Sequence, residues 1–310
     1  MQDLILYHYS MSPFAEKMRT MLGYTGIPWQ SVTVREMPPR KVLTILAGGY
    51  RKIPVAQIGA DVFCDTRVIS DELARISGRP ELSLTGQPQD VIDFVRKTDL
   101  EIFFACVMSA SDKRMLKKLI KETSLWNALL FLRDRIAMGK SSRVRTARGP
   151  KAKVLVLEHM SSMEQMLTND FLFGDQPCIA DFSAYHGIWF VTDLGEKSWI
   201  EDYPKVKDWF ARMKAFGHGS YKTIKDKQGL EAAKSATPRA LDRASKDELT
   251  GKPVTVAPDD YGRDPVMGTL AFADDKRIIV SRTHKSVGEV HVHFPRQGFA
   301  ITAGHNKQPD

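Results

Sequence analysis

The sequence contains few cysteines: only Cys64, Cys106 and Cys178 occur in 310 residues, and they are unevenly spaced. Such a set provides neither the framework of a disulfide-rich secreted domain nor the paired spacing of a zinc site. The chain also lacks an apolar run of about 18 residues, and its start lacks the apolar stretch and cleavage site of a secretory signal. These absences predict a cytoplasmic protein that has no membrane as its partner.

Basic residues are concentrated in one stretch of the sequence. The net charge is +8, and between Arg133 and Lys153 eight basic residues accompany a single acid, Asp134. Glycine, proline, serine and threonine in the same stretch predict an interhelical loop, whose charge can attract an anionic ligand or a nucleic acid. Because neither interleaved aromatic residues nor a known nucleic-acid motif accompanies the charge, we do not expect a nucleic-acid partner.

The first 70 residues carry three short motifs, and the first follows an apolar strand at residues 4–7. It is Ser12-Pro13-Phe14-Ala15, from which a helix is expected to about Tyr24. Pro13 suits a first helical turn, where its missing N–H would have no partner anyway, and Ser12 is a favourable N-cap residue. Alternatively the same hydroxyl, beside free backbone N–H groups and the positive end of the helix dipole, donates to a bound thiolate.

The other two motifs are Lys52-Ile53-Pro54-Val55 and Asp65-Thr66. A proline would interrupt a central strand, so Pro54 belongs at a strand start or edge. If its peptide bond is cis, the N–H and C=O groups of Ile53 are free to pair with an extended peptide. Asp65 and Thr66 begin another helix, where they either cap it or help to bind an α-amino and α-carboxylate pair.

In this order and spacing, the motifs resemble the N-terminal, thioredoxin-like domain of cytosolic glutathione transferases. The resemblance covers residues 3–78 closely and a helical half to about residue 225 more loosely. Ser12-Pro13-Phe14-Ala15 takes the place of Cys-Pro-Tyr-Cys in glutaredoxins and of Cys-Pro-Phe-Ala in the omega class. Serine at position 12 and alanine at position 15 exclude dithiol redox chemistry.

The resemblance implies a role for each motif. Ser12 would face the glutathione sulfur as the catalytic hydroxyl, with Tyr9 as the reserve candidate. Ile53 would pair with the cysteinyl backbone, Lys52 would reach the glycyl carboxylate, and Asp65 with Thr66 would hold the γ-glutamyl end. The implied glutathione-binding residues are Phe14, Lys52, Ile53, Pro54, Asp65 and Thr66.

Apolar periodicity predicts helices at residues 88–110, 113–138 and 152–167. A further helix begins near Cys178, where Asp181 can reach back to the Cys178 N–H. After residue 229 a charged, alanine-rich linker or helix precedes a segment that the transferase family ordinarily lacks. Turn residues separate five short strands there, which we expect to pack on the helical body: 254–256, 267–273, 277–281, 289–294 and 299–302.

The predicted fold class is α/β plus all-α. It consists of a thioredoxin-like domain at 1–80, an all-helical domain at 86–228, a linker or helix at 229–250 and a small antiparallel β module at 251–310. The resemblance implies a homodimer. We expect no metal, because His291 and His293 share a strand face but lack a third ligand with clear spacing.

The predicted function is that of a glutathione transferase-like enzyme. It would bind glutathione as cosubstrate and activate its thiolate for attack on a small electrophilic substrate. Two alternatives remain open: a non-catalytic binding or scaffold protein that kept the fold, and a glutathione-dependent isomerase or lyase.

Overall fold

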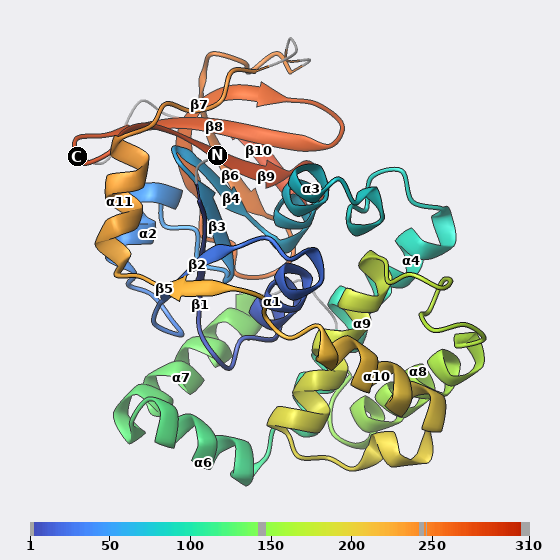
Figure 1. Cartoon of the computed structure of the whole chain (residues 1–310). Coiled ribbons are helices and arrows are strands. Elements are labelled where there is room, and N and C mark those ends of the chain that lie inside the picture. The colour runs from blue at the N-terminus through green and yellow to red at the C-terminus, as the bar shows by residue number, and fades with distance from the viewer. Residues whose placement is uncertain (1–2, 142–146, 242–244, 246, 305–310) are drawn as a thin grey trace.

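The computed structural model describes residues 3–141, 147–241, 245 and 247–304 (Figure 1). Arg143 and Arg145 of the predicted basic loop lie outside the described residues. None of the described helices combines the length and the hydropathy that a membrane crossing requires.

The N-terminal part of the chain has a thioredoxin-like fold, as predicted. Strand β1 (Leu4–His8) pairs in parallel with β2 (Trp29–Thr33) and antiparallel with β3 (Val55–Ile58), which pairs with β4 (Asp61–Cys64). Successive side chains of a strand point to opposite faces of the sheet. Accordingly, Leu4 and Leu6 join one apolar core, whereas Ile5 and Tyr7 join another.

Helices cover both faces of this sheet. Helices α1 (Pro13–Thr25) and α3 (Thr66–Ser77) contribute to the core that contains Leu4 and Leu6. Helix α2 (Lys41–Ala47) contributes to the other core. The starts of α1 and α3, which carry the first and third sequence motifs, therefore belong to the same side of the sheet.

The middle of the chain is helical, as predicted, but two helices differ from their expected form. The helix predicted at 88–110 contains a π-helical turn, and the one predicted at 113–138 divides near Ser124, whose φ is 154°. Short 3-10 turns lie at Pro80–Leu82 (η1) and Trp199–Asp202 (η4). The remaining elements are α4 (Gln89–Lys97), π-helical η2 (Thr98–Ile102), α5 (Phe103–Ala110), α6 (Lys113–Glu122), α7 (Leu125–Ser141), α8 (Pro150–Met166), α9 (Ile179–Trp189), π-helical η3 (Phe190–Leu194) and α10 (Pro204–Ala215).

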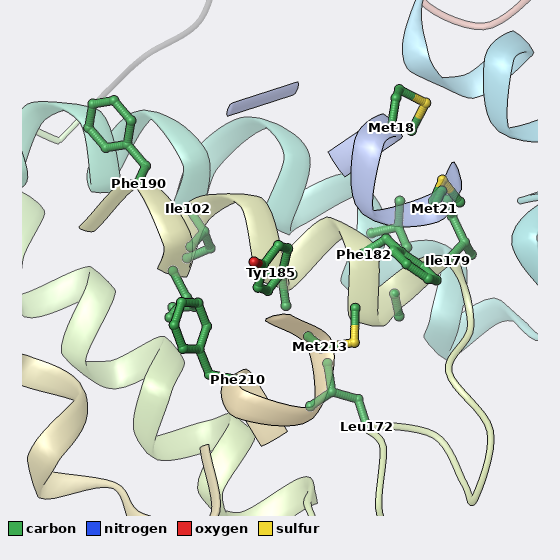
Figure 2. Close-up of a cluster of buried hydrophobic side chains, with 14 of the residues drawn as sticks. Met18, Met21, Ile102, Leu172, Ile179, Phe182, Tyr185, Phe190, Phe210 and Met213 are labelled. Atoms are coloured by element: carbon green, nitrogen blue, oxygen red, sulfur yellow. The ribbon is translucent and has the colours of Figure 1, made fainter. Parts of the chain in front are cut away.

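One apolar core joins the helical part to the thioredoxin-like part. Figure 2 shows Met18 and Met21 of α1 in the same cluster as Ile179, Phe182 and Tyr185 of α9. All five side chains are buried. Full burial of one such side chain stabilises the fold by roughly 1.5–3 kcal/mol relative to leaving it exposed to water. The shared core therefore joins the two parts into one packed unit.

Asp181 organises the helical part from within. Its carboxylate is fully buried and accepts hydrogen bonds from Cys178 N at 2.9 Å, Leu172 N at 2.9 Å and Trp209 Nε1 at 2.8 Å. The bond to Cys178 confirms the predicted reach back to the start of α9. One side chain therefore connects α9, the loop before it and α10.

The chain then returns to the sheet. Strand β5 (Tyr221–Thr223) pairs in parallel with β2, and α11 (Asp226–Lys234) follows it. The five strands predicted after residue 251 are confirmed: β6 (Pro253–Pro258), β7 (Val266–Ala273), β8 (Arg277–His284), β9 (Gly288–Pro295) and β10 (Phe299–Ala303).

The expected place of these strands was wrong. The strands instead continue the thioredoxin-like sheet, because β9 pairs in parallel with β4 and extends the sheet to ten strands in the order β10-β6-β7-β8-β9-β4-β3-β1-β2-β5 (Figure 1). The buried side chains Val290, Val292 and Phe294 of β9 join the same core as Val62 of β4. The unpaired edge of β4 and this shared core explain the placement.

We expect Asp181→Ala to lower the free energy of unfolding by about 3 kcal/mol or more, because three buried donors lose their acceptor. Urea unfolding followed by circular dichroism measures the change. Asp208→Ala is the matched control, since Asp208 is exposed on α10 and its loss should cost less than about 0.5 kcal/mol. Equal midpoints for the two variants would contradict this account of Asp181.

Candidate functional site

A pocket of about 330 Å³ lies where the three parts of the chain meet. All six residues predicted to bind glutathione line it: Phe14, Lys52, Ile53, Pro54, Asp65 and Thr66. Arg96 and Asp99 contribute from the helical part. The turns between β6 and β7 and between β9 and β10 close it, through residues 259–261 and 297–298.

The segment before β3 presents backbone groups to the pocket. The Ile53–Pro54 peptide bond is cis. Within the described part of the chain, neither the N–H nor the C=O group of Ile53 has a hydrogen-bond partner. These two groups are available to an extended peptide. Such a peptide can form backbone hydrogen bonds with them, as a neighbouring strand would in a sheet.

Asp65 begins α3 and faces Arg67. Its Oδ1 accepts from the Arg67 N–H at 3.0 Å and from Arg67 Nε at 3.1 Å. Burial acts to raise the pKa of Asp65, but the charge and hydrogen bonds of Arg67, with the charge of Lys52, hold it below its ordinary value. Asp65 therefore lines the pocket as a carboxylate at neutral pH.

Ser12 and Tyr9, the predicted catalytic hydroxyls, are not part of the pocket lining. Ser12 is buried and caps α1, since its Oγ accepts from the Ala15 N–H at 3.3 Å. It lies two residues before Phe14, which does line the pocket. The Tyr9 carbonyl accepts a hydrogen bond from the Ser12 N–H at 3.2 Å.

A buried polar cluster supports the pocket from behind. Lys17 of α1 is almost fully buried, and its Nζ donates to Asp99 at 2.8 Å and to Ser183 at 2.7 Å. The ring of His186 lies 4.7 Å from the ring of Phe14, and burial lowers the pKa of His186 to about 4, so it is neutral at pH 7. The cluster joins α1, η2 and α9 directly behind Phe14.

The sequence motifs missed several residues that line the pocket or support it from behind. Arg67 could have been found, because it directly follows Asp65-Thr66 and shares their helix start. Lys17 and Asp99 are 82 residues apart, and each alone is typical of an exposed helix charge. The turn at 259–261 carried no local signal of a ligand site.

The predicted histidine pair has a structural partner. His293 Nε2 donates to Asp61 Oδ1 at 2.7 Å, and Arg239 also binds Asp61. The residues that the structure describes contain no group of three or more His, Cys, Asp and Glu side chains placed to hold a metal ion.

Comparisons with known proteins identify relatives of both larger parts. Residues 6–81 match the family described as "Glutathione S-transferase, N-terminal domain", and residues 100–215 match "Glutathione S-transferase, C-terminal domain". No curated protein matches the chain.

Among solved structures, a GST-like protein from Pseudomonas syringae is 35% identical, with a TM-score of 0.75 over 96% of this chain and 98% of that one. Because the match covers 96% of this chain, it includes the segment that forms β6–β10. A glutathione S-transferase from Rhodospirillum rubrum F11 is 20% identical over 68% of this chain and 88% of that one, with a TM-score of 0.43. One from Sinorhizobium meliloti 1021 is 22% identical over 69% and 88%, with a TM-score of 0.42.

We expect Lys17→Met to lower the free energy of unfolding by about 3 kcal/mol, because it leaves Asp99 without its buried partner. Denaturant unfolding measures the loss. Lys205→Met is the matched control, since Lys205 is exposed on α10 and the change should cost less than about 0.5 kcal/mol. The double variant Lys17→Met/Asp99→Leu should recover most of the loss, and a loss as large as in the single variant would argue against the pair.

Proposed function

The chain belongs to the glutathione S-transferase family, and we propose that it binds glutathione in this pocket and activates the thiol for attack on an electrophilic small molecule. One observation carries the proposal. The six residues that the sequence assigns to glutathione come from three separate segments, and all six line a single pocket.

The proposed orientation follows the chemistry of the lining. Asp65 and Thr66 take the γ-glutamyl end, where a carboxylate can pair with the α-ammonium group. The free N–H and C=O groups of Ile53 take the cysteinyl backbone. Lys52 lies at the glycyl end. This orientation directs the cysteinyl sulfur toward the start of α1.

The proposed chemistry needs a thiolate near neutral pH. A free thiol has a pKa of about 8.5, and a hydrogen-bond donor together with a helix N-terminus lowers it. Ser12 Oγ accepts from Ala15, so its own hydrogen is available to donate to sulfur. The thiol proton passes to solvent, the thiolate electron pair forms the S–C bond, and the leaving group departs with the electron pair of its broken bond to carbon.

A homodimer and a cytoplasmic location belong to the same proposal. Both edges of β4 are paired, one with β3 and one with β9, so a second copy cannot add to the sheet at β4. Analytical ultracentrifugation measures the oligomeric state.

We expect Ser12→Ala to leave glutathione affinity within a few fold and to lower turnover of an electrophile by roughly 10²-fold, as loss of one oriented donor often does. Calorimetry measures affinity, and ultraviolet difference absorbance of bound glutathione measures ionisation of its thiol. Ser10→Ala is the matched control, since Ser10 is exposed two residues earlier.

Each outcome of this experiment has a meaning. Unchanged turnover in Ser12→Ala together with a loss in Tyr9→Phe would transfer the role to Tyr9. Binding by the unaltered protein without thiol ionisation would support a scaffold. Binding with ionisation but no reaction with halogenated acceptors would support an isomerase or lyase. No binding at millimolar concentration, either of glutathione or of a derivative altered only at its glycyl carboxylate, would refute the proposal.

Asp65→Asn should weaken glutathione binding by about tenfold, because the amide can still cap α3 but cannot pair with the α-ammonium group. Calorimetric titration measures the change. Asp208→Asn, an exposed substitution on α10, should leave the dissociation constant unchanged. Equal affinity in Asp65→Asn and the unaltered protein would remove Asp65 from the γ-glutamyl site.

A further inference from the structure

The chain supplies its own carboxylate to the lysine at the glycyl end of the pocket. Asp260, in the turn between β6 and β7, accepts a hydrogen bond from Lys52 Nζ at 2.7 Å through its Oδ1. The same Nζ lies 4.0 Å from the centre of the Tyr261 ring. Both side chains of the ion pair are largely shielded from solvent, with 14% of Lys52 and 27% of Asp260 exposed.

The β6–β7 turn is built against this part of the pocket. Gly262 has a φ of 59°, which favours glycine, and a Cβ there would lie 3.3 Å from Arg51 Cδ. Arg51 binds Asp264 of the turn at 3.2 Å and also binds Asp134 of α7. These contacts, both with residues that follow Asp260, hold the turn against Arg51, and the Tyr261 N–H donates to Asp260 Oδ1 at 2.6 Å.

The β9–β10 turn engages the other two basic residues of the pocket. Arg67 donates to the Gln297 carbonyl at 2.8 Å, and Arg96 donates to Gln297 Oε1 at 3.1 Å. Gly298 has a φ of 79°, and a Cβ there would lie 3.2 Å from an Arg67 guanidinium nitrogen. Every basic side chain that lines the pocket is therefore already engaged by a group of this chain.

The resulting charge does not suit a ligand with two free carboxylates. Three basic side chains line the pocket, Lys52, Arg67 and Arg96, against four acidic ones, Asp65, Asp99, Asp259 and Asp260. A glycyl carboxylate near Lys52 would lie beside the Asp260 carboxylate. The repulsion between these two negative charges would disfavour binding. An amide at that position would instead donate an N–H to Asp260 and leave its pair with Lys52 intact.

We propose that Asp260 is a specificity-determining residue and that the pocket takes a glutathione derivative whose glycyl carboxylate is an amide in preference to glutathione itself. This inference rests on the proposed function, because it takes the glycyl end to lie at Lys52. Asp259 is exposed beside Asp260 and also lines the pocket, so an amide that carries an amine would gain a second attractive contact.

The test is calorimetric titration of the full chain with glutathione and with its glycyl amide. The unaltered protein should bind the amide about tenfold more tightly or better. In Asp260→Asn, glutathione should gain about tenfold in affinity and the preference for the amide should fall to within about threefold. Asp275→Asn, an exposed substitution in the β7–β8 turn of the same module, should keep the preference of the unaltered protein.

The possible failures are distinguishable. If the unaltered protein binds glutathione as tightly as the amide, the selection by Asp260 is refuted and the proposed function stands. Equal gains for both thiols in Asp260→Asn would show that Asp260 only closes the pocket, which also refutes the selection. If neither thiol binds to any variant, the proposed function fails, and this inference fails with it.

Discussion

The parallel pairing of β9 with β4 is the contact on which the composition of the pocket depends. Its register sets Asp61 opposite His291 and Phe63 opposite His293. A hydrogen bond from His293 to Asp61 fixes the two strands to each other, and Arg239 binds both Asp61 and Glu72 of α3. Because the register fixes where the strands end, it also fixes where the turns of the module fall. Both turns fall on the pocket.

A second constraint acts from the helical side. The ion pair between buried Lys17 and half-buried Asp99 joins α1 to η2, and Ser183 of α9 accepts from the same Nζ. Replacement of such a pair by apolar residues is often harmless, whereas loss of one partner is costly. Asp99 is also part of the pocket lining, so the pair ties the wall of the pocket to the helix that Ser12 caps. The start of α1 and the wall therefore have one fixed relative position.

Features that depend on short segments of the chain could be predicted from the sequence. The motifs around Phe14, Ile53 and Asp65 resemble those of glutathione transferases, and this resemblance implied six residues that all line the pocket. The five C-terminal strands were also found from their turns and their β-rich composition. Their position could not be found, since β4 and β9 are joined across 232 residues from Asp61 to His293 and periodicity does not show which edge a strand will meet. The lining residues 259–261 could not be predicted for the same reason.

The placement of β6–β10 beside β4 reverses the sign of the net charge of the residues that line the pocket. Without the two turns, Lys52, Arg67 and Arg96 face two carboxylates, Asp65 and Asp99, and the lining is basic by one charge. The turns add Asp259 and Asp260 and no basic residue, so the lining becomes acidic by one charge. A segment that served only to stabilise the sheet edge could end in turns of any charge. Because one of the added carboxylates, Asp260, pairs with the lysine that would otherwise attract an anion, the module acts on what the pocket accepts as well as on how the sheet is closed.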